Sequence, residues 1–288
     1  MYGRLIGTVT PNPAIDKTYK IPGFKEGCFN RVKSMRIDPG GKAINIARLL
    51  KGFGCNVRAL GFFGGTAGEE LIRVLVEKKI TVDPVIVSGE TRTNIKIIND
   101  TSKVVTEINE PGPQVTEEEK RLLCKKVEAM ARESDSIVFA GSLPEGFAPD
   151  YYNHLIRISK KHGVKTVLDS SETSLMEGLK ASPFLVKPNN LELSQILGRD
   201  IKTEYDAEKG AKELREVYQV EYVVVSLGAK GAIAVGEAET FYAIPPEVKA
   251  VNTVGAGDCM VAGLIYSLRA GYRIEEALRL ATAAGTLA

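Results

Sequence analysis

Histidine and cysteine are scarce in this sequence, and what is present is dispersed. Because the only histidines are His154 and His162, a His-based metal site is not expected. A Ser-His hydrolytic triad is not excluded, but no nucleophile elbow lies near either histidine. The four cysteines include no CxxC pair and are typical of free thiols in a reducing compartment.

Long apolar runs and an excess of one charge are also missing. No run of about 18 apolar residues occurs, so we expect no membrane span. The formal net charge of the 288 residues is +2, without a basic stripe, and this argues against a nucleic-acid partner. Residues 5–10 already read as a buried strand, with no signal peptide before them. We therefore expect a cytoplasmic protein.

The patterns that are present indicate a single α/β domain over residues 1–288. Buried strands alternate with helical stretches, and strand after strand ends in a polar or glycine-rich loop. In a mostly parallel central sheet flanked by helices, such loops gather at one edge, where ligands bind. The helices that we expect after the first third of the chain cover about 149–161, 171–178, 204–218 and a segment from about 274.

Two segments interrupt this alternation and predict a small β-sheet lid. Residues 18–38 carry alternating apolar positions typical of short antiparallel strands, and residues 92–109 read as a hairpin. Arg92 stands at the root of the hairpin, where its guanidinium could bind a phosphate or make a surface ion pair.

The chain is organised around the stretch 251–263, where glycines precede an apolar helical run. The free amides and the positive dipole end of such a helix favour an anion, most often a phosphate. Asp258 would repel that phosphate unless it accepts a proton from an attacking hydroxyl. The alternative is an Asp that merely suits a helix N-terminus, and a short glycine motif is compatible with both interpretations.

A second glycine-led helix start lies at residues 38–47. Lys42 and Asn45 are three residues apart and share one face of its first turn, so they could hold a phosphate and a hydroxyl together. A solvated lysine and a capping asparagine fit equally well. Asp16, which follows the first strand, lies where ligands are expected but also suits a solvated turn.

At this point the sequence resembles the PfkB carbohydrate kinases of the ribokinase-like superfamily. Residues 40–47 resemble the first signature of that family, and residues 252–258 closely resemble the second. Three further motifs appear between them in family order, at 141–144, 187–192 and 225–231. The resemblance spans nearly the whole chain and implies a ribokinase-like fold with ATP and Mg²⁺ bound at the site.

The resemblance also implies a role for individual residues. Asp258 would be the catalytic base, and the amides of Gly255, Ala256 and Gly257 would form the anion hole. Asn189 and Glu192 would organise Mg²⁺ through water. Sugar hydroxyls would be held by Asp16, Gly41 and Asn45, and the phosphate already on the sugar by Lys42 and Arg92, with Ser142 nearby. ATP would be held by Lys187, Ser226, Gly228, Lys230 and Gly231.

Finer motifs at residues 12–16, 91–94 and 106–113 resemble the phosphosugar branch of the family. They favour a phosphorylated ketohexose as the substrate, with fructose 1-phosphate as the first hypothesis. Tagatose 6-phosphate and fructose 6-phosphate stay open, because Ala43 replaces a glycine usual in the first signature. A non-catalytic sugar-phosphate sensor is the hypothesis outside the enzyme class. The resemblance further implies a homodimer that pairs through the β lid.

Overall fold

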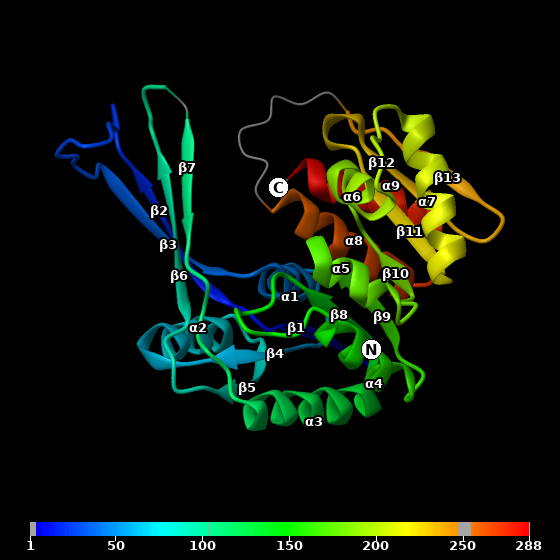
Figure 1. Ribbon diagram of the computed structural model, residues 1–288, viewed down its shortest axis with the longest axis horizontal. Coiled ribbons are helices and arrows are strands. Elements are labelled where there is room, and N and C mark those ends of the chain that lie inside the picture. Colours follow the sequence, from blue (N-terminus) through cyan, green and yellow to red (C-terminus); the bar gives the residue numbers. More distant parts are fainter. Residues whose placement is uncertain (1–3, 103, 247–254, 288) are drawn as a thin grey trace.

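The computed structural model describes residues 4–102, 104–246 and 255–287, and a large parallel sheet runs through it (Figure 1). Within these residues the sheet has nine strands in the order β13-β12-β11-β10-β9-β8-β1-β4-β5. The pairing is parallel from β11 to β5 and antiparallel for β12 and β13 at the other edge. The strands are β1 (Leu5–Thr10), β4 (Val57–Phe63), β5 (Thr81–Ile86), β8 (Ser134–Ala140), β9 (Lys165–Asp169), β10 (Leu185–Val186), β11 (Tyr222–Ser226), β12 (Ala232–Val235) and β13 (Thr240–Ala243).

Helices cover both faces of this sheet because its strands are apolar on both sides. In β8, Ile137 and Phe139 join one apolar cluster while Val138 and Ala140 join the other. One face packs against α1 (Lys42–Gly52), α2 (Gly65–Glu77), α8 (Ala256–Arg269) and α9 (Ile274–Thr286). The other face packs against α3 (Glu117–Glu133), α4 (Tyr151–Lys160), α5 (Glu172–Leu179), α6 (Asn190–Leu197) and α7 (Glu204–Tyr218). The mostly parallel sheet with flanking helices confirms the predicted fold class.

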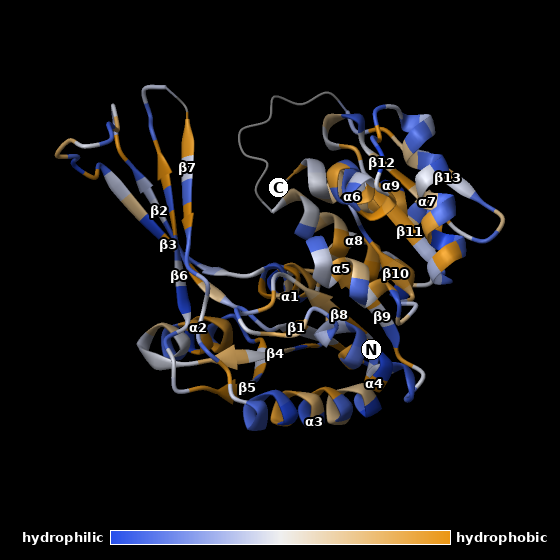
Figure 2. Cartoon of the chain, in the orientation of Figure 1, coloured by the Kyte–Doolittle hydropathy of each residue, from blue (hydrophilic) through white to orange (hydrophobic). Residues whose placement is uncertain are grey.

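Helix α3 illustrates how the sequence specifies these helices. Thr116 and Glu119 form the capping box that their spacing predicts, each side chain bonding to the backbone N–H of the other residue. Leu123, Val127 and Met130 recur at helical spacing and are buried against the sheet. Polar and apolar stretches consequently alternate along this helix in Figure 2.

A second, four-stranded sheet projects from one side of the molecule (Figure 1). Its order is β3 (Ser34–Gly40), β2 (Ala14–Lys20), β6 (Arg92–Ile98) and β7 (Val105–Asn109). Pairing is antiparallel at β2–β3 and β6–β7 but parallel between β2 and β6. Strand β2 already begins at Ala14, so Asp16 lies in this second sheet, not in a turn after β1.

The structure also contains one helix that the sequence pattern did not predict. Helix α6 begins directly after Asn189, and among its residues only Leu193 is buried, so it has little apolar periodicity. Within the three described ranges, none of the helices combines the length and the apolar character that crossing a bilayer requires.

Candidate active site

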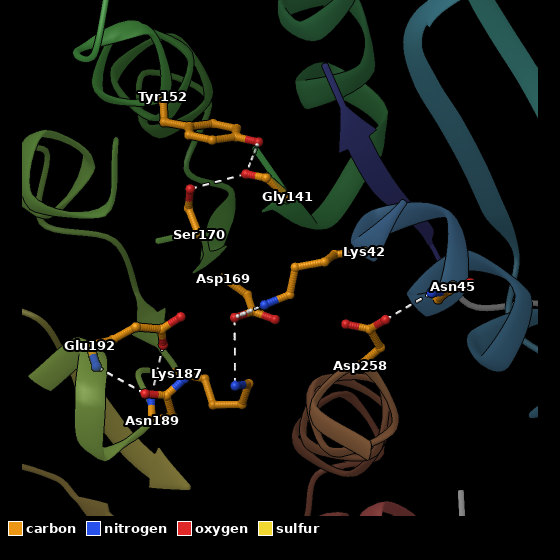
Figure 3. Close-up of polar contacts among 10 residues, drawn as sticks. All are labelled: Lys42, Asn45, Gly141, Tyr152, Asp169, Ser170, Lys187, Asn189, Glu192 and Asp258. Carbon is orange, nitrogen blue, oxygen red and sulfur yellow. Dashed lines mark hydrogen bonds and ion pairs between the residues drawn. The ribbon is translucent and has the colours of Figure 1, made fainter. Parts of the chain in front are cut away.

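The predicted site residues gather at the carboxyl edge of the large sheet, beside the root of the small one. Lys42 and Asn45 lie in the first turn of α1, Lys187 directly follows β10, and Asp258 lies in the first turn of α8. Figure 3 shows these side chains facing a common space. This is the edge at which open α/β sheets bind ligands.

Gly255 lets the chain turn into helix α8. Its φ of 88° lies in the left-handed region, which other residues rarely adopt. The first bond inside the helix runs from the Cys259 amide to the Gly255 carbonyl, at 2.9 Å. The amides of the residues between them therefore point out of the helix, at the positive end of its dipole. Residues 252–254 of the second signature lie outside the described residues.

Asp258 is a buried acid with an unusual proton affinity. Its side chain is 6% exposed, and its Oδ2 accepts a hydrogen bond of 2.9 Å from the Asn45 amide. Burial raises the pKa of Asp258 to about 6, and the negative charge of Asp169 adds to this effect. Asn45 and the two lysines, Lys42 and Lys187, oppose the rise only in part. A carboxylate of this pKa is suited to accept a proton near neutral pH.

Asp169, at the end of β9, is the residue that our sequence analysis missed. Its side chain is fully buried, and its Oδ1 lies 2.9 Å from the Lys42 Nζ and 3.5 Å from the Lys187 Nζ. Burial alone would favour the neutral acid, but the two ammonium groups hold the pKa of Asp169 below its ordinary value. Its Oδ2 has no hydrogen-bond partner among the described residues. The sequence feature that could have indicated Asp169 is its position at the carboxyl end of a buried strand, where ligands bind in α/β sheets.

The same carboxylate stabilises the charged form of Lys42, whose side chain is 37% exposed. Burial lowers the pKa of a lysine, yet Asp169 outweighs it and the pKa of Lys42 is raised. Lys187 is only 4% exposed. The structure thus brings two cations and two carboxylates together beside the start of α8, and a Cβ added at Gly257 would lie 3.6 Å from the Lys187 Nζ.

Asn189 and Glu192, predicted to organise a metal ion, form the capping box of α6. The Asn189 side chain accepts from the Glu192 amide at 2.9 Å, and the Glu192 carboxylate accepts from the Asn189 amide at 2.8 Å. This reciprocal pair fixes the Glu192 carboxylate beside Lys42, whose pKa it helps to raise. Among residues 4–102, 104–246 and 255–287, no three His, Cys, Asp or Glu side chains form a cluster suited to a metal ion.

Asp16, Gly41 and Arg92 lie where the two sheets meet. Gly41 precedes α1 with a φ of 108°, and Asp16 packs so closely that a Cβ on Gly40 would lie 2.4 Å from its carboxyl carbon. The Asn94 amide donates to Asp16 at 2.9 Å. Burial raises the pKa of Asp16 despite this hydrogen bond.

Arg92 has an unusual combination of burial and free donors. Its two terminal nitrogens donate to the carbonyls of Asn12, at 3.1 Å, and Glu110, at 3.3 Å. Its Nε is buried and has no partner in the described part of the chain. The Asn12 amide in turn lies 3.5 Å from the Ser142 Oγ. Arg92 and Lys42, predicted to hold one phosphate, therefore contact different protein groups.

The predicted nucleotide contacts lie along the loop that follows β11. The Ser226 amide bonds to the Pro188 carbonyl at 3.0 Å, which ties this loop to the Lys187 segment. Gly228–Lys230 forms a single 3₁₀ turn, and Gly231 follows with a φ of 95°. Next to this turn is a cavity of about 300 Å³ lined by Glu204, Leu227, Lys230, Ala232, Tyr242, Ala243 and Ile244.

A buried acid beside outward-facing amides and two ammonium groups suits the transfer of a phosphoryl group to a hydroxyl. Comparison with known proteins agrees with this class. Residues 5–288 match the profile of the pfkB family carbohydrate kinases. The chain therefore belongs to the pfkB family and is a phosphotransferase that acts on a hydroxyl group.

Named relatives and solved structures support this membership along the whole chain. The 1-phosphofructokinase of Vibrio cholerae is 37% identical over 98% of this chain and 88% of that protein. The 1-phosphofructokinase of Rhodobacter capsulatus is also 37% identical, over 96% of this chain and 88% of that protein. The tetrameric inhibited form of Escherichia coli phosphofructokinase-2 superposes with a TM-score of 0.93 at 33% identity, covering 98% of this chain and 93% of that chain. This likeness confirms the ribokinase-like fold.

Proposed function

We propose that this kinase transfers the terminal phosphoryl group of ATP to the free primary hydroxyl of fructose 1-phosphate, yielding fructose 1,6-bisphosphate and ADP. The observation that carries the proposal is Asp258, a buried acid of raised pKa in the first turn of a glycine-led helix. A sensor that only binds a sugar phosphate needs no such base. The names of the relatives at 37% identity support fructose 1-phosphate as the acceptor.

In the proposed reaction, the sugar hydroxyl oxygen forms a bond to phosphorus while its proton passes to Asp258. The bond between that phosphorus and ADP breaks, and ADP leaves with the electron pair. The amides of Gly255, Ala256 and Gly257 would stabilise the charge that develops on the transferred group. The Asn45 hydrogen bond would hold the Asp258 carboxylate in one orientation during this step.

The sugar would bind where the small sheet meets the large one. Arg92, with its buried and unpartnered Nε, is the group that we assign to the phosphate already on the sugar. The charge of Asp258 helps to raise the pKa of Lys42, and this proximity supports an additional role for Lys42 on the transferred phosphoryl group. The proposed hydroxyl contacts remain Asp16, Gly41 and Asn45, with Ser142 nearby.

ATP would bind along the loop after β11. The cavity beside Gly228–Lys230 combines apolar walls with the Lys230 ammonium, which lies 3.7 Å from the Glu204 carboxylate. The apolar walls suit an adenine ring, and the ammonium suits its nearby phosphates. We propose phosphate or nucleotide contacts for Lys187, Ser226, Gly228, Lys230 and Gly231. Mg²⁺ would neutralise the phosphates, held through water by Asn189 and Glu192, because Mg²⁺ retains much of its hydration shell.

Fructose 6-phosphate is the second candidate acceptor, and a specific observation favours it. Escherichia coli phosphofructokinase-2 in complex with fructose-6-phosphate superposes with a TM-score of 0.90 at 31% identity. Tagatose 6-phosphate stays a third possibility within the same reaction class. All three sugars carry a phosphate that Arg92 could bind.

The direct test is ADP formation with Mg·ATP against fructose 1-phosphate, fructose 6-phosphate, tagatose 6-phosphate and unphosphorylated fructose, compared by kcat/KM. We expect fructose 1-phosphate to give the highest value. Fructose should be poor, because the Arg92 guanidinium would then be left without its anion. A higher value for either 6-phosphate would replace the acceptor and keep the mechanism.

We further propose that the small sheet acts as a lid, formed by about 18–38 and 92–109, and pairs with its counterpart in a homodimer. Three apolar side chains that are about half exposed, Met35, Ile37 and Ile108, share one face of this sheet and support this pairing. Figure 2 shows apolar segments along β6 and β7. All four cysteines are free thiols, which supports the proposed cytoplasmic location.

A further inference from the structure

A cavity of about 360 Å³ lies at the edge of the large sheet opposite the candidate active site. The starts of three neighbouring strands are staggered there. Ser136 of β8 pairs with Lys165 of β9, and Val167 of β9 pairs with Leu185 of β10. Strand β8 thus starts two residues before β9, and β9 two residues before β10. The last turns of α3 and α8 and the loop after α4 enclose the recess. Strand β9 separates this cavity from Asp169, which lies at its other end.

Cations dominate the charged lining of this cavity. Arg4, Arg132, Lys165 and Arg269 line it, against the single carboxylate of Asp135. Asp135 lies between two of them, 3.3 Å from the Arg269 Nε and 3.9 Å from the Arg4 Nε. Asp135 thus offsets part of the charge of Arg4 and Arg269. Glu128, outside the lining, offsets part of the charge of Arg132. The positive charge that remains favours a negatively charged occupant.

The other two cations, Arg132 and Lys165, are exposed and lie at the rim of the cavity. Arg132 bonds to Glu128 at 2.8 Å, and His162, which also lines the cavity, lies 3.6 Å from the same carboxylate. The Lys165 Nζ lies 4.5 Å from the centre of the Phe184 ring. Within the described residues, no carboxylate lies within 4.0 Å of the Lys165 ammonium, so its charge is available to a ligand.

The rest of the lining is mostly apolar but includes two hydroxyls, and the one on Ser134 donates to the Met130 carbonyl at 2.7 Å. The side chain of Ser136 is 8% exposed, and its Oγ has no hydrogen-bond partner among the described residues. A buried hydroxyl of this kind is costly unless a ligand or a water satisfies it. The apolar wall consists of Ala131, Val167, Phe184, Leu185, Ile265 and Leu268.

We propose that this cavity is a second binding site, which takes a small organic phosphate ester that carries an apolar ring. The cations would bind the phosphate, the apolar wall would pack against the ring, and the Ser136 hydroxyl would complete the polar contacts. The volume of the cavity falls in the range of small-molecule sites. The inference is independent of the proposed function, because none of these residues belongs to the candidate active site.

Calorimetric titration of the full chain with phenyl phosphate tests this proposal. Saturable binding to one site is expected, with weaker binding of benzyl alcohol, which lacks the charge, and of inorganic phosphate, which lacks the ring. The double variant R132Q/K165Q should bind phenyl phosphate at least about tenfold more weakly, because it removes two cations from the lining. Both side chains lie at the rim, so the fold should persist; K165Q alone provides the same test with a smaller change.

Two matched variants separate this cavity from other sites. K161Q removes an exposed lysine that lies next to the cavity without lining it, and K42Q removes a cation from the candidate active site. Neither should weaken the binding of phenyl phosphate. The proposal is overturned if no saturable binding occurs, if R132Q/K165Q binds as tightly as the wild type, or if K42Q abolishes binding.

Discussion

At the scale of single residues, two buried carboxylates of the site differ in pKa because their surroundings differ. Asp169 faces two ammonium groups, which lower its pKa, whereas Asp258 receives one amide hydrogen bond and faces the charge of Asp169. Buried acids with pKa values driven apart in this way are typical of acid–base sites. The sequence pointed to Asp258 through the glycines before it. Asp169 carried no comparable local signal, because its partners Lys42 and Lys187 are brought to it by the fold.

The raised pKa of Asp258 predicts how activity depends on pH. The unprotonated carboxylate is the active form, so kcat/KM should fall as the pH decreases through about 6. Below that pH the fall should be about tenfold per unit, since one proton is involved. A pH profile of initial rates at saturating Mg·ATP measures this. A profile that stays flat down to pH 4.5 would contradict the assignment, as that is within about one unit of an ordinary Asp.

The variant D169N tests whether the charge of Asp169 contributes to the raised pKa of Asp258. Loss of the negative charge of Asp169 should lower the pKa of Asp258, and the acidic limb of the profile should move to lower pH. The maximal rate should fall as well, because Lys42 and Lys187 would lose their common partner.

Arg92 should act on substrate binding more than on turnover. In R92A the phosphate of the sugar loses a charge-assisted contact, so KM for fructose 1-phosphate should rise by about tenfold or more. The KM for ATP should change little. R73A, which removes an exposed arginine of α2 that pairs with Glu70, is the matched control. An unchanged KM for the sugar in R92A would place its phosphate elsewhere.

At the scale of elements, local patterns predicted most of the fold. The helix at 204–218 and the capping box of α3 follow from signals within a few residues of one another. The parallel pairing of β2 with β6 joins segments far apart in the chain, so no local pattern revealed it. The sequence pattern does not predict helix α6, because the helix buries only Leu193 and because its capping residues, Asn189 and Glu192, also suit Mg²⁺.

Two glycines at the start of α8, Gly255 and Gly257, have different roles, and alanine substitutions can distinguish them. Gly255 has a φ of 88°, and among the described residues no atom beyond its chain neighbours lies within 4 Å of an added Cβ. G255A should therefore lower the free energy of unfolding by about 1–2 kcal/mol through backbone strain. Gly257 is helical, and its added Cβ would lie beside Lys187. G257A should therefore keep its stability but lose turnover, because the methyl group occupies the space of the anion.

Denaturant unfolding and steady-state kinetics of both variants measure these effects. If G255A were as stable as the wild type, the left-handed turn before α8 would be in doubt. If G257A kept full kcat, the proposed anion hole would have to lie elsewhere.

At the scale of the whole molecule, the two sheets differ in what covers them. The large sheet is buried on both faces by helices, whereas the small sheet projects from the body (Figure 1). The small sheet also exposes apolar side chains. A large exposed apolar surface often marks a protein interface. The sequence predicted this sheet from alternating patterns, but which of its faces is exposed follows only from the way it joins the body.

We expect the small sheet to hold two copies of the chain together. The variant I37K/I108K places charges at two positions about half exposed on β3 and β7, and it should convert a dimer to a monomer. Light scattering after size exclusion measures the mass. L280K, on the exposed side of α9, is the matched control and should leave the dimer intact. A wild-type chain that is monomeric at micromolar concentration would contradict this prediction.

The central claim is that Asp258 is the base of a phosphoryl transfer, and single-turnover kinetics of D258N test it most directly. Asn keeps the size of the side chain but cannot take the proton. We predict that D258N folds and binds ATP and the phosphosugar with ordinary affinity, while its rate of transfer falls about 10²- to 10⁴-fold. A variant that binds both ligands and still transfers phosphate at close to the wild-type rate would contradict the account.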